Sequence, residues 1–355
     1  MQRFEVNKTA FGEHRVSTVD ESELKDGEIR VAVDFFAFTA NNMTYAAAGN
    51  TLGYWQFFPV AGDDGYGVIP VWGFADVVES RTDDIAIGER LYGYFPPAGS
   101  LVMLPVRIDE KTLFDGAEHR QALPPLYNRY QRVRSGGAVE AEYLQALLGP
   151  LYNTSYCLWD QLQDNDYYGA QQVLLLSASS KTSIGLAKAL ADDDKSPPVL
   201  GLTSAGNIEF VKSLGYYDDA LGYEALGDVP QVPTVIVDMA GNAANAEALR
   251  HHLGDNLTYF ISVGLTHWDQ ADSKLDSSRD RHEWFFAPSY MLERSQALPP
   301  GEFVKNAQRF VMAAAAAAGD WLNLQEVSGV EAFSQHYDDI CAGSMNPAEG
   351  LICKL

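Results

Sequence analysis

Apolar and polar residues follow different patterns in the two halves of the chain. In the second half, four short apolar runs predict strands buried on both faces, at 173–176, 199–203, 234–239 and 257–264. Between them, apolar residues at helical spacing predict helices at 184–190, 207–214 and 245–253. Strands that alternate with helices are typical of an α/β fold with a doubly wound parallel sheet.

In the first half, short segments separated by turn residues predict strands at 27–37, 68–72, 75–80, 90–95 and 100–105. A short helix is predicted over 41–49, and an aromatic, glycine-containing loop follows at 52–59. Closely spaced strands of this kind favour a small, β-rich, barrel-like unit. A chain of 355 residues is long enough for two units with separate cores.

Three further segments complete the pattern. Residues 108–137 are polar, aromatic and comparatively basic, which fits either a long functional connection or a solvated surface loop. Residues 141–162 have a helical pattern that we expect to break near Gly149 and Pro150. A helix is predicted over 301–321, and the chain ends on a short strand at 350–355.

The segment after the strand at 173–176 has the strand, turn and helix order that presents backbone N–H groups to a phosphate. Of the three glycines usual in a dinucleotide-binding turn, only Gly185 is present. Hydroxyl side chains take up the rest of the turn: Ser177, Ser179, Ser180 and Ser183. A Walker A motif is excluded because Leu175 and Ser180 occupy its glycine positions. A purely structural turn remains the alternative.

Composition narrows the function further. The 48 acidic and 25 basic residues give a net charge of −23, which argues against a nucleic-acid-binding or anionic-membrane-binding surface. Three scattered cysteines form neither a disulfide framework nor a zinc motif. The N-terminus lacks the apolar core of a secretory signal, and the apolar run at 310–318 is too short to span a bilayer. We therefore expect a cytoplasmic protein.

The order and spacing of several segments resemble the medium-chain dehydrogenase/reductase superfamily, in its zinc-free quinone-oxidoreductase-like branch. The segments are 41–45, 69–79, 87–93, 151–156, 212–215, 238–241 and 263–265. The resemblance implies a GroES-like catalytic domain over 1–143, a Rossmann NADP-binding domain over 144–283, and a return to the catalytic domain over 284–355. It implies a homodimer that transfers hydride from NADPH to a small-molecule quinone or enone. A non-catalytic NADPH-binding protein and an enoyl-thioester reductase are the alternatives.

The resemblance also assigns cofactor contacts. The second strand of the sheet ends in Thr203 and Ser204 and has no carboxylate there, which favours NADP over NAD because Ser204 and Asn207 can donate to a 2′-phosphate. Lys212 and Lys181 add positive charge, although Lys212 is equally explained as a solvated helix residue. Relatives place a tyrosine over the phosphate at Tyr223. The remaining contacts are Thr182 and Gly185 in the turn, and Thr154, Ala240, Gly241, Val263, Gly264 and Leu265 near the nicotinamide.

Hydride transfer without a metal needs a donor for the substrate oxygen. Ala40, Val71 and Trp72 stand where zinc-dependent relatives carry their ligands, so we expect no metal. Tyr54 in the aromatic loop is the first candidate donor, followed by Tyr45, Asn41 and Asn42. For either tyrosine, the alternative is a half-buried aromatic side chain with a structural role.

Overall fold

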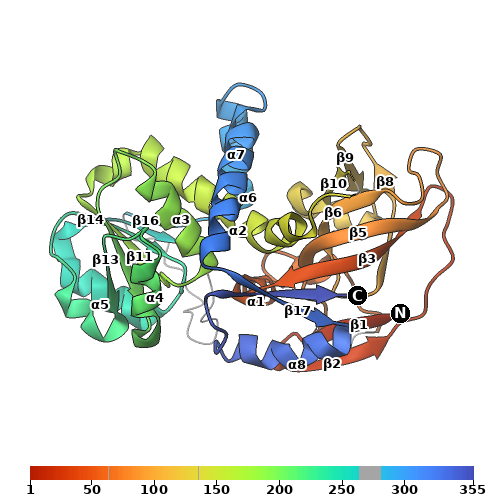
Figure 1. Ribbon diagram of the computed structural model, residues 1–355, viewed down its shortest axis with the longest axis horizontal. Helices are drawn as coiled ribbons and strands as arrows, with labels where there is room; N and C mark the ends of the chain where they lie inside the picture. The colour runs from red at the N-terminus through yellow and green to blue at the C-terminus, as the bar shows by residue number, and fades with distance from the viewer. Residues whose placement is uncertain (63, 135, 264–280) are drawn as a thin grey trace. The chain divides into compact units, whose positions relative to one another are not determined.

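The computed structural model describes residues 1–62, 64–134, 136–263 and 281–355 (Figure 1). The chain forms two compact units. The first comprises Met1–Leu147 and Leu322–Leu355, and the second comprises Leu148–Trp321. A β-rich unit and a unit with a parallel sheet are the two parts that the sequence predicts, so the fold class is confirmed.

Among its described residues, the second unit has a sheet of six parallel strands in the order β13-β12-β11-β14-β15-β16. Their bounds are β11 Gln172–Leu176, β12 Val199–Thr203, β13 Asp219–Gly222, β14 Thr234–Asp238, β15 Leu257–Ser262 and β16 His282–Trp284. The order reverses between β11 and β14, which are neighbours in the sheet although two strands separate them in the chain. Ligands of doubly wound sheets bind beside the carboxyl ends of the strands at such a reversal.

Helices cover both faces of this sheet (Figure 1). They are α2 Val139–Asp164, α3 Lys181–Ala191, α4 Ile208–Ser213, α5 Ala243–Leu253, α6 Ala287–Ala297 and α7 Glu302–Ala317. In β11, Val173 and Leu175 join a core cluster with residues of α2, α3 and α7. Leu174 and Leu176 join a second cluster with residues of α5. Alternate residues therefore pack on opposite faces, which is why the strand is apolar throughout.

Two expectations for this unit differ from the structure. Helix α2 continues through Pro150 instead of breaking there. The side chains of Asn153, Thr154 and Ser155 donate to the carbonyls of residues four positions earlier, which supplies hydrogen bonds to the turn around the proline. The second unit also extends to Trp321, beyond the boundary expected at residue 284, because α7 packs Phe303 and Ala307 into its core.

The first unit contains two sheets. The smaller has the order β2-β1-β4, and the larger has the order β17-β18-β3-β5-β6-β10-β9-β8 with β7 paired to β3. The strands are β1 Gln2–Asn7, β2 Ala10–Thr18, β3 Ile29–Phe38, β4 Tyr66–Gly67, β5 Val71–Ser80, β6 Arg90–Phe95, β7 Ser100–Met103, β8 Pro105–Val106, β9 Thr112–Asp115, β10 Arg129–Val133, β17 Asn323–Ser328 and β18 Glu349–Lys354. The two strands predicted at 68–72 and 75–80 are replaced by the single strand β5.

Helices α1 Ala40–Ala47 and α8 Val330–Cys341 complete the first unit. Phe333 and Tyr337 of α8 pack their rings against Phe4 of β1 and Phe38 of β3. The C-terminal segment therefore closes the core that the N-terminal strands begin. Neither β1 nor α8 is predicted from the sequence pattern.

Segment 108–137 is neither a long connection nor a solvated loop. It contributes β9 and β10 to the larger sheet, together with the short 3₁₀ helices η2 Glu118–Arg120 and η3 Pro125–Asn128. Arg120 is 1% exposed, and its Nη1 donates to Asp115 Oδ2 at 2.6 Å and to Tyr130 Oη at 2.9 Å. Its guanidinium also lies over the Phe58 ring at 4.8 Å. The polar residues of this segment are thus partly interior.

Candidate functional site: the carboxyl edge of the parallel sheet and a buried tyrosine cluster

Polar side chains gather where β11 and β12 end. Ser179 Oγ accepts hydrogen bonds from Thr203 Oγ1 at 3.0 Å and from Asn207 Nδ2 at 3.1 Å. Asn207 Nδ2 also lies 3.1 Å from Ser204 Oγ. Parallel strands bring their carboxyl ends to one edge, so residues distant in the sequence meet here. The edge carries hydroxyl and amide groups at the end of β12, as the sequence indicates.

The turn between β11 and α3 takes a conformation that favours glycine, although it contains none. Ser177 has φ of 55°, in the left-handed region. Its N–H donates to Tyr223 Oη at 2.8 Å, which ties the turn to the residue that follows β13. Burial raises the pKa of Tyr223 to about 12, so this hydroxyl stays neutral near pH 7. Tyr223 therefore contacts the turn, and its predicted contact with a cofactor phosphate stays a prediction.

Helix α3 begins directly after this turn. Ser180 is its N-cap and accepts from the Ser183 N–H, while Ser183 Oγ donates to the Leu176 carbonyl at 3.1 Å. Lys181 and Thr182 are therefore the first two residues of the helix. The N-terminus of a helix favours anions because its first N–H groups lack intrahelical acceptors and its dipole is positive there.

Gly185 is required by helix packing. A Cβ at this position would lie 2.5 Å from Tyr152 Cδ1 and 2.6 Å from Ser155 Oγ of α2. Ser155 Oγ in turn donates to the Thr182 carbonyl at 2.7 Å. Among the candidate cofactor residues, Gly185 thus acts by letting α3 approach α2, and this contact fixes the first turn of α3.

The end of β14 is organised by Asp238, which sequence reasoning did not single out. This residue is 2% exposed, and its Oδ1 accepts from the N–H groups of Ala240 at 2.8 Å and Gly241 at 3.0 Å. The Val263 N–H, after β15, donates to the Asp238 carbonyl at 2.9 Å. Ala240, Gly241 and Val263 therefore lie together at the carboxyl edge. Gly264 and Leu265 lie outside the described residues.

Two other candidate residues, Lys212 and Thr154, do not belong to the hydrogen-bond network around Ser179. Lys212 forms an ion pair with Asp219, with Nζ 2.8 Å from Oδ1. Asp219 is paired with Leu200 near the start of β12, which is the opposite end of that strand from Thr203. Lys212 is therefore held toward the amino end of the sheet. Thr154 lies in the middle of α2, where its hydroxyl donates to the Pro150 carbonyl at 3.3 Å.

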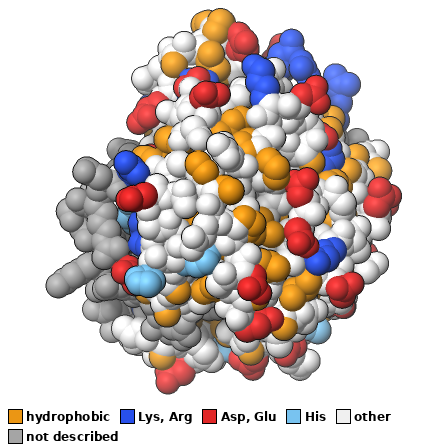
Figure 2. Space-filling view, turned by 90° about the vertical axis from the view of Figure 1, so that its left-hand side faces the viewer, with side chains coloured by type: hydrophobic (Ala, Val, Ile, Leu, Met, Phe, Trp, Pro, Cys, Tyr) orange, Lys and Arg blue, Asp and Glu red, His pale blue; other side chains and the backbone are white. Residues whose placement is uncertain are grey.

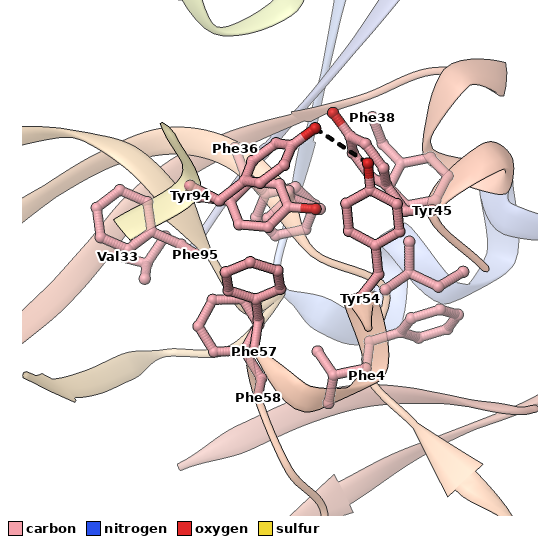
Figure 3. Close-up of a cluster of buried hydrophobic side chains, with 14 of the residues drawn as sticks. Phe4, Val33, Phe36, Phe38, Tyr45, Tyr54, Phe57, Phe58, Tyr94 and Phe95 are labelled. Atoms are coloured by element: carbon pink, nitrogen blue, oxygen red, sulfur yellow. Dashed lines mark hydrogen bonds between the residues drawn. The ribbon is translucent and has the colours of Figure 1, made fainter. Parts of the chain in front are cut away.

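In the first unit, the candidate proton donors belong to a cluster of buried aromatic side chains (Figure 3). Tyr54 is 3% exposed, and its Oη lies 3.0 Å from Tyr127 Oη, the hydrogen bond dashed in Figure 3. Trp72 Nε1 donates to Tyr45 Oη at 3.2 Å. The Tyr94 ring packs against Tyr127 at a tilt of 35°, with ring centroids 4.7 Å apart. The buried Tyr94 hydroxyl has no hydrogen-bond partner in the described part of the chain.

Burial controls the acidity of these phenols. It raises the pKa of Tyr54 to about 12, while the hydrogen bond from Tyr127 lowers it. Burial likewise raises the pKa of Tyr45, and contacts with Trp72 and Asn41 lower it. All of these hydroxyls are neutral near pH 7 and can act as hydrogen-bond donors. Tyr127 was not among the candidates, although the sequence hinted at it through the aromatic residues between 127 and 134.

Asn41 and Asn42 differ in the contacts that their side-chain amides make. Asn42 Oδ1 accepts from the Thr39 N–H at 2.9 Å in the capping box of α1, and its Nδ2 donates to the Pro70 carbonyl at 2.9 Å. This side chain is 5% exposed and is used to hold α1. Asn41 is only partly buried and points its amide toward Tyr45, whose pKa it lowers.

Three further features concern metal ligands, membrane spans and surface charge. Within 1–62, 64–134, 136–263 and 281–355, no group of three or more His, Cys, Asp or Glu side chains has the arrangement of a metal site. No helix in those ranges is long and apolar enough to cross a membrane. Figure 2 shows acidic side chains scattered over the face that it presents rather than collected in one area.

The chain matches one sequence family and resembles several solved structures. A sequence model of a family described as "Protein of unknown function (DUF2855)" matches residues 36–346. No curated protein matches the chain by sequence. Among solved structures, CurA from Vibrio vulnificus in complex with NADPH is similar at 11% identity and a TM-score of 0.64, covering 100% of this chain and 99% of its own.

Two more solved structures are similar over nearly their whole length. The yhdH oxidoreductase from Salmonella enterica in complex with NADP has 13% identity, a TM-score of 0.54 and coverage of 100% of both chains. The CurK enoyl reductase has 10% identity, a TM-score of 0.57 and coverage of 99% of this chain and 98% of its own. The chain therefore shares the fold of these three solved structures.

The packing at Gly185 yields a stability prediction. Gly185→Ala places a methyl group within 2.6 Å of α2 and should destabilise the second unit by about 1–3 kcal/mol, the usual cost of overpacking. Gly319→Ala is the matched control, because a Cβ there meets nothing within 4 Å. Urea unfolding of the three proteins measures the effect. Equal stability of Gly185→Ala and the wild type would show that α3 is not held at this contact.

Proposed function

The chain belongs to the DUF2855 family, and we propose that it is an NADPH-dependent oxidoreductase that reduces a quinone or an activated C=C bond of an enone. The observation that carries the proposal is the carboxyl edge of the parallel sheet. There, hydroxyl and amide side chains from the turn after β11 and from the end of β12 form one network around Ser179. The NADPH and NADP complexes of the similar folds support the choice of cofactor.

The residues present fit this cofactor. The first turn of α3, with Lys181 and Thr182, offers N–H groups and a positive dipole for the pyrophosphate. Ser204 and Asn207 stand where NAD-specific proteins carry a carboxylate, and they can donate to a 2′-phosphate. Tyr223, Ala240, Gly241 and Val263 follow the neighbouring strands. When bound, NADPH would supply the hydride.

The cofactor preference is testable by calorimetry. NADPH should bind more tightly than NADH, and Asn207→Asp should weaken NADPH by about 1.5–3 kcal/mol, because a donor is replaced by a charge that repels the phosphate. NADH binding should change far less. Lys212→Gln is the control variant, since Lys212 is already paired with Asp219 and should leave both affinities near the wild-type values. Tighter binding of NADH would contradict the assignment of the adenosine end.

The proposed reaction also needs a hydrogen-bond donor for the substrate oxygen. Addition of hydride to an enone or quinone leaves negative charge on the substrate oxygen, and a hydroxyl directed at that oxygen lowers the barrier. Tyr54 is the donor we propose, because its phenol is neutral near pH 7 and is held by a defined hydrogen bond. Tyr45 takes a supporting place, because its hydroxyl already accepts from Trp72.

Tyr54→Phe should therefore lower turnover roughly tenfold or more, while NADPH affinity stays near the wild-type value. The melting temperature should fall slightly, because the buried Tyr127 hydroxyl loses its partner. Tyr45→Phe should act more weakly. The assay is NADPH oxidation with a panel of quinones, enones and enoyl thioesters. Turnover confined to the thioesters would favour an enoyl-thioester reductase, as the similarity to the CurK enoyl reductase suggests. NADPH binding without any turnover would favour a non-catalytic role.

We also propose that the reaction needs no metal. Ala40, Val71 and Trp72 offer no ligands at the positions that carry zinc in related enzymes. Activity should survive dialysis against a chelator with less than about a twofold change, within ordinary assay scatter. Elemental analysis of the same sample checks the metal content. Loss of activity on chelation, with recovery on adding zinc, would contradict this part of the proposal.

A further inference from the structure

Tyr54 and Tyr127 form a pair of hydroxyls that lie far apart in the sequence. Tyr54 begins the 3₁₀ helix η1 Tyr54–Gln56, and Tyr127 belongs to η3. Their Oη atoms are 3.0 Å apart, and the side chains are 3% and 6% exposed. In a hydrogen bond between two phenols, one hydroxyl donates and the other accepts. Whichever donates determines where the remaining proton can point.

The surroundings of Tyr127 fix its hydroxyl in place. Its ring packs against Tyr94 at 4.7 Å and Phe57 at 5.5 Å between ring centroids. The next residue, Asn128, donates from Nδ2 to the Arg120 carbonyl at 2.9 Å, and Arg120 is itself held by the buried pair with Asp115. The segment that carries Tyr127 is therefore anchored by a charged interaction in the interior. Such an anchor is expensive unless it is well formed.

We propose that Tyr127 is a positioning residue for Tyr54: its hydroxyl donates to Tyr54 Oη, which directs the proton of Tyr54 away from the pair and toward the substrate. This inference rests on the proposed function. In the reaction, hydride and its two electrons come from NADPH, which is oxidised, and the substrate is reduced. The Oη–H bond of Tyr54 breaks, its proton passes to the substrate, and its electron pair stays on Oη. A proton from water later restores the phenol.

The buried environment of Tyr54 explains why the Tyr127 hydroxyl should affect the proton transfer. The phenolate that Tyr54 becomes lies among aromatic rings, where burial disfavours charge and raises the pKa of Tyr54 to about 12. A hydrogen bond donated by Tyr127 opposes that effect. Because both side chains are buried, loss of this donor cannot be replaced by bulk water.

The test compares Tyr127→Phe with a matched control, Tyr92→Phe. Tyr92 is also buried in the larger sheet of the first unit, but its hydroxyl donates to the Gln145 carbonyl at 3.3 Å, away from the pair. We expect Tyr127→Phe to lower kcat roughly three- to tenfold with KM nearly unchanged, as for loss of one hydrogen bond in the transition state. In the double variant with Tyr54→Phe, the second substitution should have little further effect. Tyr92→Phe should retain wild-type kcat.

A second measurement does not depend on activity. In protein labelled with carbon-13 at tyrosine Cζ, the resonance that disappears in Tyr54→Phe belongs to Tyr54. That resonance should shift in Tyr127→Phe and stay in place in Tyr92→Phe, with no cofactor added. Wild-type kcat in Tyr127→Phe, while Tyr54→Phe is slow, would overturn the inference and leave the proposed function standing. A wild-type protein that binds NADPH but reduces nothing would instead overturn the proposed function, and the inference with it.

Discussion

The candidate cofactor edge depends on the close contact between α2 and α3 at Gly185. No side chain larger than hydrogen fits there, because a Cβ would meet Tyr152 and Ser155 within 2.6 Å. The contact sets the distance of α3 from α2, and the hydrogen bond from Ser155 to the Thr182 carbonyl fixes its first turn. The position of the backbone N–H groups in the first turn of α3 therefore depends on this contact. The absence of a side chain at Gly185 thus determines where several residues of this edge lie.

Hydrogen bonds explain how the turn after β11 can be rich in serine instead of glycine. Ser177 adopts a left-handed conformation, which costs a residue with a Cβ about 1–2 kcal/mol. The hydrogen bond from its N–H to Tyr223 Oη and the cap formed by Ser180 and Ser183 offset that cost. Side-chain hydrogen bonds thereby stabilise a conformation that glycine would adopt through its conformational freedom. The consequence is a turn joined directly to the ends of β12 and β13.

The sequence predicted the parts of the fold that depend on local pattern. The apolar run of β11 indicated a strand buried on both faces, and its alternate residues do pack into two separate clusters. Pro150 misled the prediction, because side-chain donors four residues along the helix support the backbone in a way that no local rule anticipates. Segment 108–137 misled it for a similar reason. Arg120 reads as a surface residue until Asp115 and Tyr130 are placed beside it.

In the candidate site, too, features set by local pattern could be predicted from the sequence, and features set by contacts between distant residues could not. Ser179, Thr203 and Asn207 follow two neighbouring parallel strands, and such strands end at one edge, so their meeting can be expected from the sequence. Their contact with a cofactor stays a prediction. The meeting of Tyr127 with Tyr54 could not be expected, because it depends on two 3₁₀ helices that are 73 residues apart and on an interior ion pair. A buried hydroxyl that lacks a partner costs about 1–3 kcal/mol. The hydrogen bond between the Tyr54 and Tyr127 hydroxyls avoids this cost for both groups, whereas the Tyr94 hydroxyl beside them has no partner in the described residues.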